Sequence, residues 1–403
     1  MKYIVILGDG MPDEQLEELE GKTPLAYAHT PFMDELARCG EVGLARTVPP
    51  GMPPGSDVAN LAVLGYDPEK YYTGRSPIEA VAMGVKLAEE DVSFRCNLVT
   101  LSEGMPYEEK KMLDYSAGEI GTSEAREIIE DVAGRLGNDI FNFCPGISYR
   151  HLLVWRGGPG ASTFTLTPPH DITGKGIAAH LPQGKDAGVL LEFMKRSSVF
   201  LPEHPANRKR AARGLKMANS IWLWGEGGKP RLDSFPEKYG LEGAVISAVD
   251  LIKGLGILAG LEVADVPGAT GNINTDYRGK AQKALAMLQD GLDFVFIHIE
   301  APDEAGHHGD LQEKIKAIEE IDVQVVGEIK RGLADFPDYR LMVLADHPTP
   351  LRLRTHTSDP VPFCIYNKGD DLKNQQGKLS EDFAAGGTFI EKGHTLMDYF
   401  LRK

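Results

Sequence analysis

Three apolar runs decide the fold of this 403-residue chain: YIVIL at 3–7, DFVFIHIE at 293–300 and RLMVLADH at 340–347. Each run is short and apolar, as buried strands are, and the first is rich in β-branched residues. Gly-Asp-Gly follows the first run, APDEAGHHGD follows the second, and the third ends in an acid and a histidine. The pattern predicts three strands that deliver polar residues at their carboxyl ends.

Segments with helical periodicity separate these strands, among them LQEKIKAIEEIDVQVVGEIK at 311–330. Alternation of strands and helices predicts an α/β fold with a doubly wound, mostly parallel sheet. In such sheets ligands bind outside the carboxyl ends of the strands. We therefore expect the polar strand ends to meet in one crevice, although they are far apart in the chain.

The middle of the chain, residues 88–225, has a different pattern. It contains the strand candidates SFRCNLVTL, YRHLLVW and STFTLT and fewer long helical stretches. We expect an inserted α+β domain there, with a core domain formed by residues 1–87 and 226–403. The loops around 65–87 and 225–245, which are rich in Gly and Pro, are the expected crossing points.

Composition narrows the classes of function. The chain has 43 Lys and Arg against 59 Asp and Glu, and this net charge of −16 argues against binding to nucleic acid. It has no long apolar stretch, and its N-terminal apolar run is too short for a signal peptide, so we expect no membrane association and a cytoplasmic location. Its four cysteines lack the spacings of zinc or disulfide frameworks, so we expect reduced thiols.

The segment DEAGHHGD contains a candidate pair of metal ligands. Asp303 and His307 are four residues apart, which places both side chains on one face of a helical turn. A carboxylate and an imidazole could bind Mn²⁺ or Zn²⁺. The same spacing is also common on solvated helix faces, and the neighbouring His308 is expected to be solvated.

Further candidates follow the other two strands. Asp9 comes after the first strand, and Asp346 and His347 come after the third, where each could also be a turn or capping residue. His356 lies in the loop RTHTSDPVPF, where flanking threonines could orient its ring. Convergence of the strand ends favours metal binding over these separate structural roles.

Ser56 lies in PPGMPPGSDVANLAVLGYD at 49–67. Pro and Gly precede it and an apolar stretch with helical spacing follows, so we expect Ser56 at a helix N-terminus. A serine there could simply cap the helix. A helix N-terminus also stabilises a phosphate, which suits a serine that carries one.

These candidates are enough for two divalent ions. Oxygen and nitrogen ligands without thiolates favour Mn²⁺, Mg²⁺ or Zn²⁺, with Co²⁺ also compatible, and the three histidines disfavour an all-magnesium site. We expect Mn²⁺. The expected sets are Asp9, Ser56, Asp346 and His347 for one ion, and Asp303, His307 and His356 for the other.

The order Asp, Ser, Asp-x3-His, Asp-His, His resembles the metal-site signature of the alkaline phosphatase superfamily. Within it, the chain resembles the short, archaeal-type cofactor-independent phosphoglycerate mutases and their bacterial relatives proposed as homoserine kinases. The similar segments are VILGDGMPD, GSDVANLAVLGYDP, GRSPIEAVAMGV, FRCNLVT, YRHLLVW, PPHDITGK and ANSIWLWGEG. The resemblance implies a phosphatase-like core interrupted by a substrate domain that closes over it.

The resemblance also implies roles for individual residues. Ser56 matches the serine that carries the phosphate, and both metal sets match the family's ligands. His170 and Asp171 match residues that handle glycerate, with Asp171 as the candidate base for the second transfer. Arg150 and Arg208 match arginines that bind the carboxylate and the phosphate, although this chain lacks the regularly spaced arginine clusters of the longer mutases.

The implied activity is the interconversion of 3-phosphoglycerate and 2-phosphoglycerate without bisphosphoglycerate, through a phosphoserine. The expected partner is a small phosphorylated substrate, and the oligomeric state stays open. The basic segment NRKR at 207–210 agrees with such a substrate but could be a solvated face.

Three alternatives stay open. A homoserine kinase would need an ATP site, yet the sequence has no Gly-x-x-x-x-Gly-Lys-Ser/Thr loop, and GEGGKP at 225–230 is a weak substitute. A simple phosphatase or another phosphomutase would share the whole metal site. A non-enzymatic binding module would have no need of seven candidate ligands at strand ends.

Overall fold

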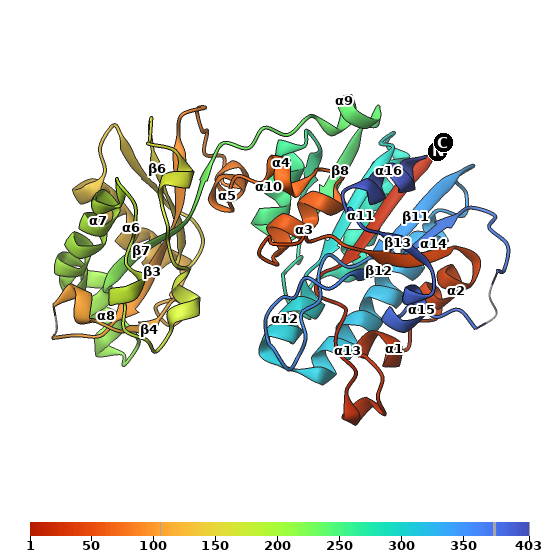
Figure 1. The fold of residues 1–403 in the computed structure, drawn as a ribbon, viewed down its shortest axis with the longest axis horizontal. Helices are drawn as coiled ribbons and strands as arrows, with labels where there is room; N and C mark the ends of the chain where they lie inside the picture. The colour runs from red at the N-terminus through yellow and green to blue at the C-terminus, as the bar shows by residue number, and fades with distance from the viewer. Residues whose placement is uncertain (105, 374–375, 403) are drawn as a thin grey trace. The chain divides into compact units, whose positions relative to one another are not determined.

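The computed structural model describes residues 1–104, 106–373 and 376–402. The chain divides into two compact units, of which the second is drawn in orange to green in Figure 1. Unit 1 comprises Met1–Tyr72 and Arg231–Lys403, and unit 2 comprises Thr73–Pro230. The middle of the chain thus forms its own unit, but its limits differ from the expected 88–225.

The first boundary lies earlier than expected because helix α5 (Ser76–Ala82) belongs to unit 2. This helix packs against strands β3 (Val92–Leu101) and β7 (Ser220–Gly228). Its Glu79 forms an ion pair with Arg95 of β3, with a distance of 3.0 Å between Oε2 and Nε. The Gly and Pro residues around it made this segment resemble a loop in the sequence.

Unit 1 is built on an eight-stranded sheet whose central strand, β1, runs parallel to both of its neighbours, β10 and β11. Only β12 runs antiparallel to the strands beside it, β11 and β2. The expected doubly wound, mostly parallel α/β sheet is confirmed. In spatial order the strands are β13 (Thr388–Ile390), β2 (Glu41–Ala45), β12 (Val361–Asn367), β11 (Tyr339–Leu344), β1 (Lys2–Gly8), β10 (Phe294–Ile299), β8 (Gly243–Ile246) and β9 (Glu262–Ala264).

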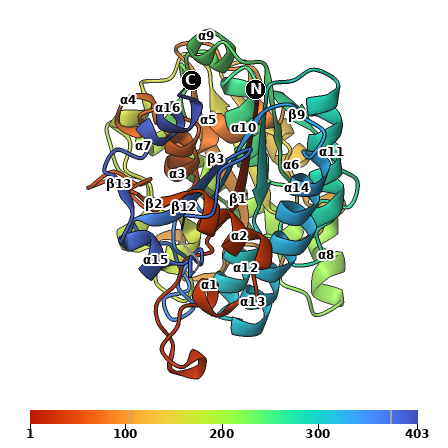
Figure 2. The ribbon, with the colours of Figure 1, turned by 90° about the vertical axis from the view of Figure 1, so that its right-hand side faces the viewer.

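Helices cover both faces of this sheet. Apolar residues of α2, α11 and α14 join alternate residues of β1, β10 and β11 in the main core, on the face seen in Figure 2. On the other face, the ring of Phe400 in α16 packs edge-on against the ring of Tyr3, with 5.7 Å between the ring centroids. The helices of unit 1 are α1 (Pro24–Tyr27), α2 (Pro31–Cys39), α3 (Ser56–Val63), α4 (Pro68–Tyr71), α9 (Phe235–Tyr239), α10 (Asp250–Leu258), α11 (Tyr277–Gln289), α12 (Ala301–His308), α13 (Leu311–Glu320), α14 (Gly327–Gly332), α15 (Glu381–Ala385) and α16 (Thr395–Leu401).

The periodic stretch 311–330 is helical, as expected, but a π-helical turn over Ile321–Val326 joins α13 to α14. The turn contains Asp322, whose carboxylate accepts the backbone N–H groups of Phe32 and Met33 at the start of α2. The distances are 3.2 and 2.6 Å. Burial raises the pKa of this carboxyl to about 6.

Unit 2 has an α+β fold with a five-stranded antiparallel sheet. The candidate strand STFTLT is absent from it: Ala161–Thr163 form a 3₁₀ turn, where the Thr163 hydroxyl donates to the carbonyl of Gly160 at 2.8 Å. As expected, strands outnumber long helices in this unit, although α6 and α7 are among the longest helices that the structure describes. The elements of unit 2 not yet given are β4 (Met112–Asp114), α6 (Thr122–Leu136), β5 (Phe141–Cys144), β6 (Arg150–Trp155), α7 (Ala187–Phe200) and α8 (Pro205–Ala212).

The structure also bears on two expectations from composition. In the part of the chain that it describes, no helix is long and apolar enough to cross a membrane. The four cysteines, Cys39, Cys96, Cys144 and Cys364, are free thiols.

Candidate metal centre

The seven predicted ligands converge at the carboxyl edge of the unit 1 sheet. Asp9 follows β1, Asp303 and His307 lie on α12 directly after β10, and Asp346 and His347 follow β11. Contacts between side chains connect all of them, with Ser56 and His356 included. Strands that are adjacent in the sheet therefore bring together residues that are distant in sequence.

Four of these residues form what we call the Ser56 group: Asp9, Ser56, Asp346 and His347. His347 Nε2 lies 3.1 Å from Ser56 Oγ. The same nitrogen lies 3.5 Å from Asp9 Oδ1 and 3.5 Å from Asp346 Oδ2. One nitrogen thus lies within 3.5 Å of three oxygens, and both kinds of atom are ligands that divalent cations bind.

Ser56 is the first residue of α3, but it does not cap this helix. Gly55 occupies the N-cap position. The Ser56 hydroxyl instead faces His347 of the same group. The simple capping role, which the sequence left open, is therefore not the role that Ser56 has.

The other three residues form the His307 group: Asp303, His307 and His356. The Nε2 atoms of the two histidines are 2.9 Å apart, and they lie 3.3 and 3.4 Å from the oxygens of Asp303. His307 Nδ1 is 3.0 Å from the carbonyl oxygen of Arg354, so Nδ1 carries a proton and donates it. In neutral His307 the lone pair of Nε2 then points into the group, as in a metal ligand.

Charge supports the presence of a cation between these residues. Burial and the charges of Asp346, Asp303 and Glu300 raise the pKa of Asp9 well above its ordinary value. Among the described residues, Asp9 Oδ1 has no hydrogen-bond partner. An acid that is buried beside other acids, with one oxygen unpaired, fits a bound divalent ion.

Protonation of the histidines differs between the two groups. Burial lowers the pKa of His347, which favours the neutral ring that a metal ligand needs. For His307, burial is outweighed by the hydrogen bond and charge of Asp303, which raise the pKa to about 9. Burial likewise opposes ionisation of Asp303, but hydrogen bonds with His307 and His356 hold its pKa well below the ordinary range. Without an ion, a proton on His307 balances the charge of Asp303.

His298 belongs to the centre, although it was not among the predicted residues. Its Nε2 lies 2.9 Å from Asp9 Oδ2, its Nδ1 lies 3.2 Å from Ser247 Oγ, and burial lowers its pKa to about 3. Ligand atoms of Asp9, His298 and Asp346 lie within 4.8 Å of one another. A histidine inside the apolar run DFVFIHIE was the signal for it in the sequence.

Two further residues fix the ligands in place. The amide of Asn60 donates to the carbonyl of Ser56 at 2.9 Å and to Asp346 Oδ2 at 2.8 Å. The hydroxyl of Thr349 lies 2.5 Å from Asp303 Oδ1 and 3.3 Å from His347 Nδ1. No motif in the sequence predicted a role for Asn60 or Thr349.

Gly10 allows the close approach of these loops. Its φ of +64° is in the region that favours glycine. A Cβ atom there would lie 2.6 Å from Thr349 Oγ1 and 2.8 Å from Asp303 Cα. The glycine after Asp9 is thus required by both conformation and space.

The predicted substrate residues lie in unit 2, and only some of them are near one another. His170 and Asp171 are on a 3₁₀ turn (Pro169–Ile172), with 3.6 Å between Nε2 and Oδ1. The ring of His170 also lies edge-on to Trp224, with 5.2 Å between centroids. Arg208, on the exposed side of α8, is instead paired with Glu203.

Arg150 and the buried Arg95 add positive charge to the same unit. Arg150 stacks on Tyr149 at 4.3 Å and, among the described residues, has no ion-pair partner. Arg95 stacks on Trp224 at 4.3 Å and pairs with Glu79. Nothing in the segment FRCNLVT indicated that its arginine would be buried.

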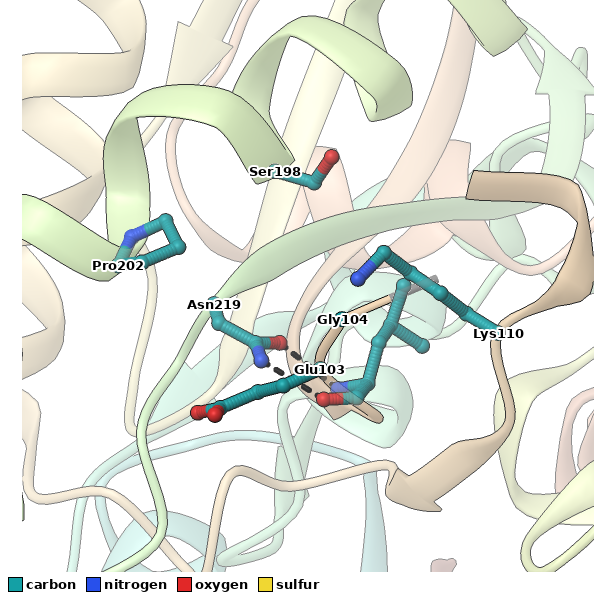
Figure 3. Close-up of a pocket in the computed structure, with 7 residues that line it drawn as sticks. Glu103, Gly104, Lys110, Ser198, Pro202 and Asn219 are labelled. Carbon is teal, nitrogen blue, oxygen red and sulfur yellow. Dashed lines mark hydrogen bonds between the residues drawn. The ribbon is translucent and has the colours of Figure 1, made fainter. Parts of the chain in front are cut away.

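A cavity of about 180 Å³ lies in unit 2, and none of the predicted residues is among those that line it (Figure 3). Three of its polar lining residues, Lys110, Ser198 and Asn219, already have partners in the protein. Both ends of the Asn219 amide bond the backbone of Leu101, Lys110 donates to the carbonyl of Ser102, and Ser198 donates to that of Lys195. This cavity is therefore not a candidate for the active site.

Comparisons with known proteins identify the family of this chain. A family model described as 2,3-bisphosphoglycerate-independent phosphoglycerate mutase matches residues 37–207. A Geobacter sulfurreducens relative named "Probable 2,3-bisphosphoglycerate-independent phosphoglycerate mutase" is 54% identical over 403 residues, 100% of both chains. A Methanothrix thermoacetophila relative named "2,3-bisphosphoglycerate-independent phosphoglycerate mutase" is 53% identical over 399 residues, 98% of each chain.

A solved structure of a protein from Pyrococcus horikoshii has the same fold. It is 30% identical with a TM-score of 0.82, and the match covers 99% of this chain and 96% of that one. The resemblance inferred from the sequence motifs is thereby confirmed over the full length. The chain belongs to the family of 2,3-bisphosphoglycerate-independent phosphoglycerate mutases.

Proposed function

We propose that this enzyme interconverts 3-phosphoglycerate and 2-phosphoglycerate through a phosphoserine on Ser56, with one divalent ion in the Ser56 group and a second in the His307 group. One observation carries the proposal. Ser56 Oγ lies at the first residue of α3 and faces His347 Nε2, at 3.1 Å, within a set of ligand atoms. A serine that only capped its helix would face the backbone.

The surroundings of Ser56 suit a phosphate carrier. Divalent ions bound in the two groups would favour the Ser56 alkoxide and neutralise charge on the phosphoryl oxygens. The first turn of α3 adds backbone N–H groups and the positive end of the helix dipole. Asn60 holds the start of this helix against Asp346, so the hydroxyl keeps its place relative to the ligands.

The reaction then has two phosphoryl transfers. Ser56 loses its hydroxyl proton and its Oγ attacks the phosphorus of 3-phosphoglycerate. The bond from phosphorus to O3 breaks, and O3 takes up one proton in place of the one that Ser56 lost, which gives glycerate. The 2-hydroxyl of glycerate next attacks the phosphoserine, its proton goes to a base, and Ser56 is released. We propose Asp171 as that base, because it is exposed and lies beside His170.

The residues of unit 2 are proposed to bind the glycerate. His170 and Arg150 are the better supported of them, since Arg150 has its guanidinium available for a carboxylate. Arg208 is retained as a candidate for the phosphate, but its ion pair with Glu203 would have to exchange for the substrate. We propose Mn²⁺ for both ion sites because each combines carboxylate oxygen with imidazole nitrogen.

Phosphorus NMR tests the proposal. The protein loaded with Mn²⁺ is incubated with 3-phosphoglycerate, the ions are removed with a chelator when the reaction stops, and the products are then observed. We expect 2-phosphoglycerate to form without added bisphosphoglycerate, and no product from metal-free protein. Release of inorganic phosphate alone would identify a phosphatase and contradict the mutase assignment.

A further inference from the structure

We propose that Thr349 is a positioning residue for both ion groups at once, and that its single hydroxyl orients Asp303 of one group and His347 of the other. The inference rests on the proposed two-ion site. It concerns a residue that carries no candidate ligand atom in either group.

Thr349 is fully buried in the loop that follows β11. Its Oγ1 lies 2.5 Å from Asp303 Oδ1 and 3.3 Å from His347 Nδ1. A hydroxyl has one proton to donate, whereas an ionised carboxylate can only accept. The hydroxyl of Thr349 therefore donates its hydrogen bond to Asp303.

The direction of the first hydrogen bond sets that of the second. Because the hydroxyl donates its hydrogen bond to Asp303, its oxygen can only accept a hydrogen bond from His347. Nδ1 of the His347 ring therefore carries the hydrogen. A neutral imidazole has one N–H, and Nε2 of His347 is consequently left with its lone pair. That lone pair faces Ser56 Oγ, Asp9 and Asp346, where an ion would be bound.

The side chain of Thr349 has little freedom to turn. The backbone carbonyl of Thr349 accepts a hydrogen bond from the buried ammonium of Lys314 at 2.8 Å, and that ammonium lies 2.7 Å from the carboxylate of Asp13. Gly10 and Gly306 pack against it so closely that a Cβ at either would lie within 2.6 Å of a Thr349 atom. The hydroxyl is thus held in the position that serves both groups.

This arrangement predicts a coupled defect. Partners that orient metal ligands typically contribute about 10- to 100-fold in metal affinity. Because one hydroxyl serves two ligands, its removal should weaken binding of both ions by about that factor. A residue that supported only one group would affect only one ion.

The test measures Mn²⁺ binding by titration calorimetry in wild-type protein and in three variants, with circular dichroism as the check on folding. Thr349→Val removes the hydroxyl and keeps the shape, and Thr349→Ser keeps the hydroxyl and removes a methyl group. Should Thr349→Val fail to fold, Thr349→Ala and Thr349→Ser form a second pair, since both lack the methyl group and differ only in the hydroxyl.

We expect two ions in the wild type, weaker binding of both in the Val and Ala variants, and near wild-type binding in Thr349→Ser. Wild-type affinity in Thr349→Val, weakening of one ion alone, or an equal loss in the Ser and Ala variants would each overturn the proposal. The readout does not involve turnover. A protein that binds two ions but isomerises nothing would contradict the proposed function and leave the role of Thr349 testable.

Discussion

The two units bury charge in different ways. In unit 2, the buried Arg95 and Arg210 are each paired with an acid, Glu79 and Glu124. At the metal centre of unit 1, Asp9, Asp303 and Asp346 are buried among histidines, and acid exceeds fixed positive charge. Balanced charges hold a scaffold together, whereas an excess of buried acid favours binding of a cation. Variants of charged residues in the two units test this distinction.

The largest effect should come from Ser56→Ala. We expect turnover to fall by about 10⁴-fold or more, because the residue that carries the phosphate is lost, while ion binding in the His307 group persists. Phosphorus NMR measures the loss. Ser198→Ala, which alters a serine at the unit 2 cavity, is the matched control and should stay as active as the wild type.

His307→Ala should remove one of the two ions, because it deletes one of the three ligands of its group. The adjacent His308 is paired with Glu304 on the solvated side of α12, so His308→Ala is the control and should bind two ions. Electron paramagnetic resonance of unbound Mn²⁺ counts the ions. Equal stoichiometry in the two variants would contradict the assignment of the His307 group.

Glu79→Gln should destabilise unit 2 alone, since it leaves the guanidinium of Arg95 buried without its acid. We expect a loss of about 3–5 kcal/mol in the free energy of unfolding of that unit. All three tryptophans, Trp155, Trp222 and Trp224, belong to unit 2, so tryptophan fluorescence in urea follows that unit.

The control is Glu203→Gln, which breaks the exposed pair with Arg208 and should leave the fluorescence transition unchanged. A transition in Glu79→Gln that coincides with that of the wild type would show that the buried pair is not structural.

The effect of Glu79 should also depend on pH. Burial opposes its ionisation, but the charges of Arg95 and Arg75 outweigh burial and lower its pKa below the ordinary value of 4.5. A lowered pKa contributes stability that is fully present above 4.5 and is lost as the pH falls through the native value. The difference in free energy of unfolding between wild type and Glu79→Gln should therefore become smaller as the pH falls below 4.5. The same fluorescence transition in urea measures it.

The smallest effect is expected for His298→Ala. This change removes a hydrogen bond to Asp9 but no predicted ligand, so Mn²⁺ affinity should fall by about 10- to 100-fold without loss of stoichiometry. Titration calorimetry distinguishes the outcomes. Loss of an entire ion would instead show that His298 is itself a ligand.

The sequence predicted which candidate ligands lie together better than it predicted which substrate residues do, and the reason is geometric. Strand ends such as Asp9 and Asp346 must meet when their strands are neighbours in a parallel sheet, so local pattern was enough to group them. Arg150 and Arg208 lie on a strand and a helix of unit 2, whose antiparallel topology imposes no such meeting point.

The supporting residues could not be predicted for a different reason. Thr349 and Asn60 act through hydrogen bonds across loops that only the folded chain brings together. The first domain boundary was missed because α5 is short and surrounded by Gly and Pro, and its attachment to unit 2 depends on the long-range pair between Glu79 and Arg95.

The pairing of β1 has a consequence for the order of folding. This strand begins at Lys2, yet its two neighbours in the sheet begin at Phe294 and Tyr339. On the ribosome, every residue of unit 2 is synthesised before either neighbour exists, so the apolar segment 3–7 must wait unpaired while 73–230 emerges. The first strand of this sheet to be made can therefore pair within it only after the whole of unit 2 has been made.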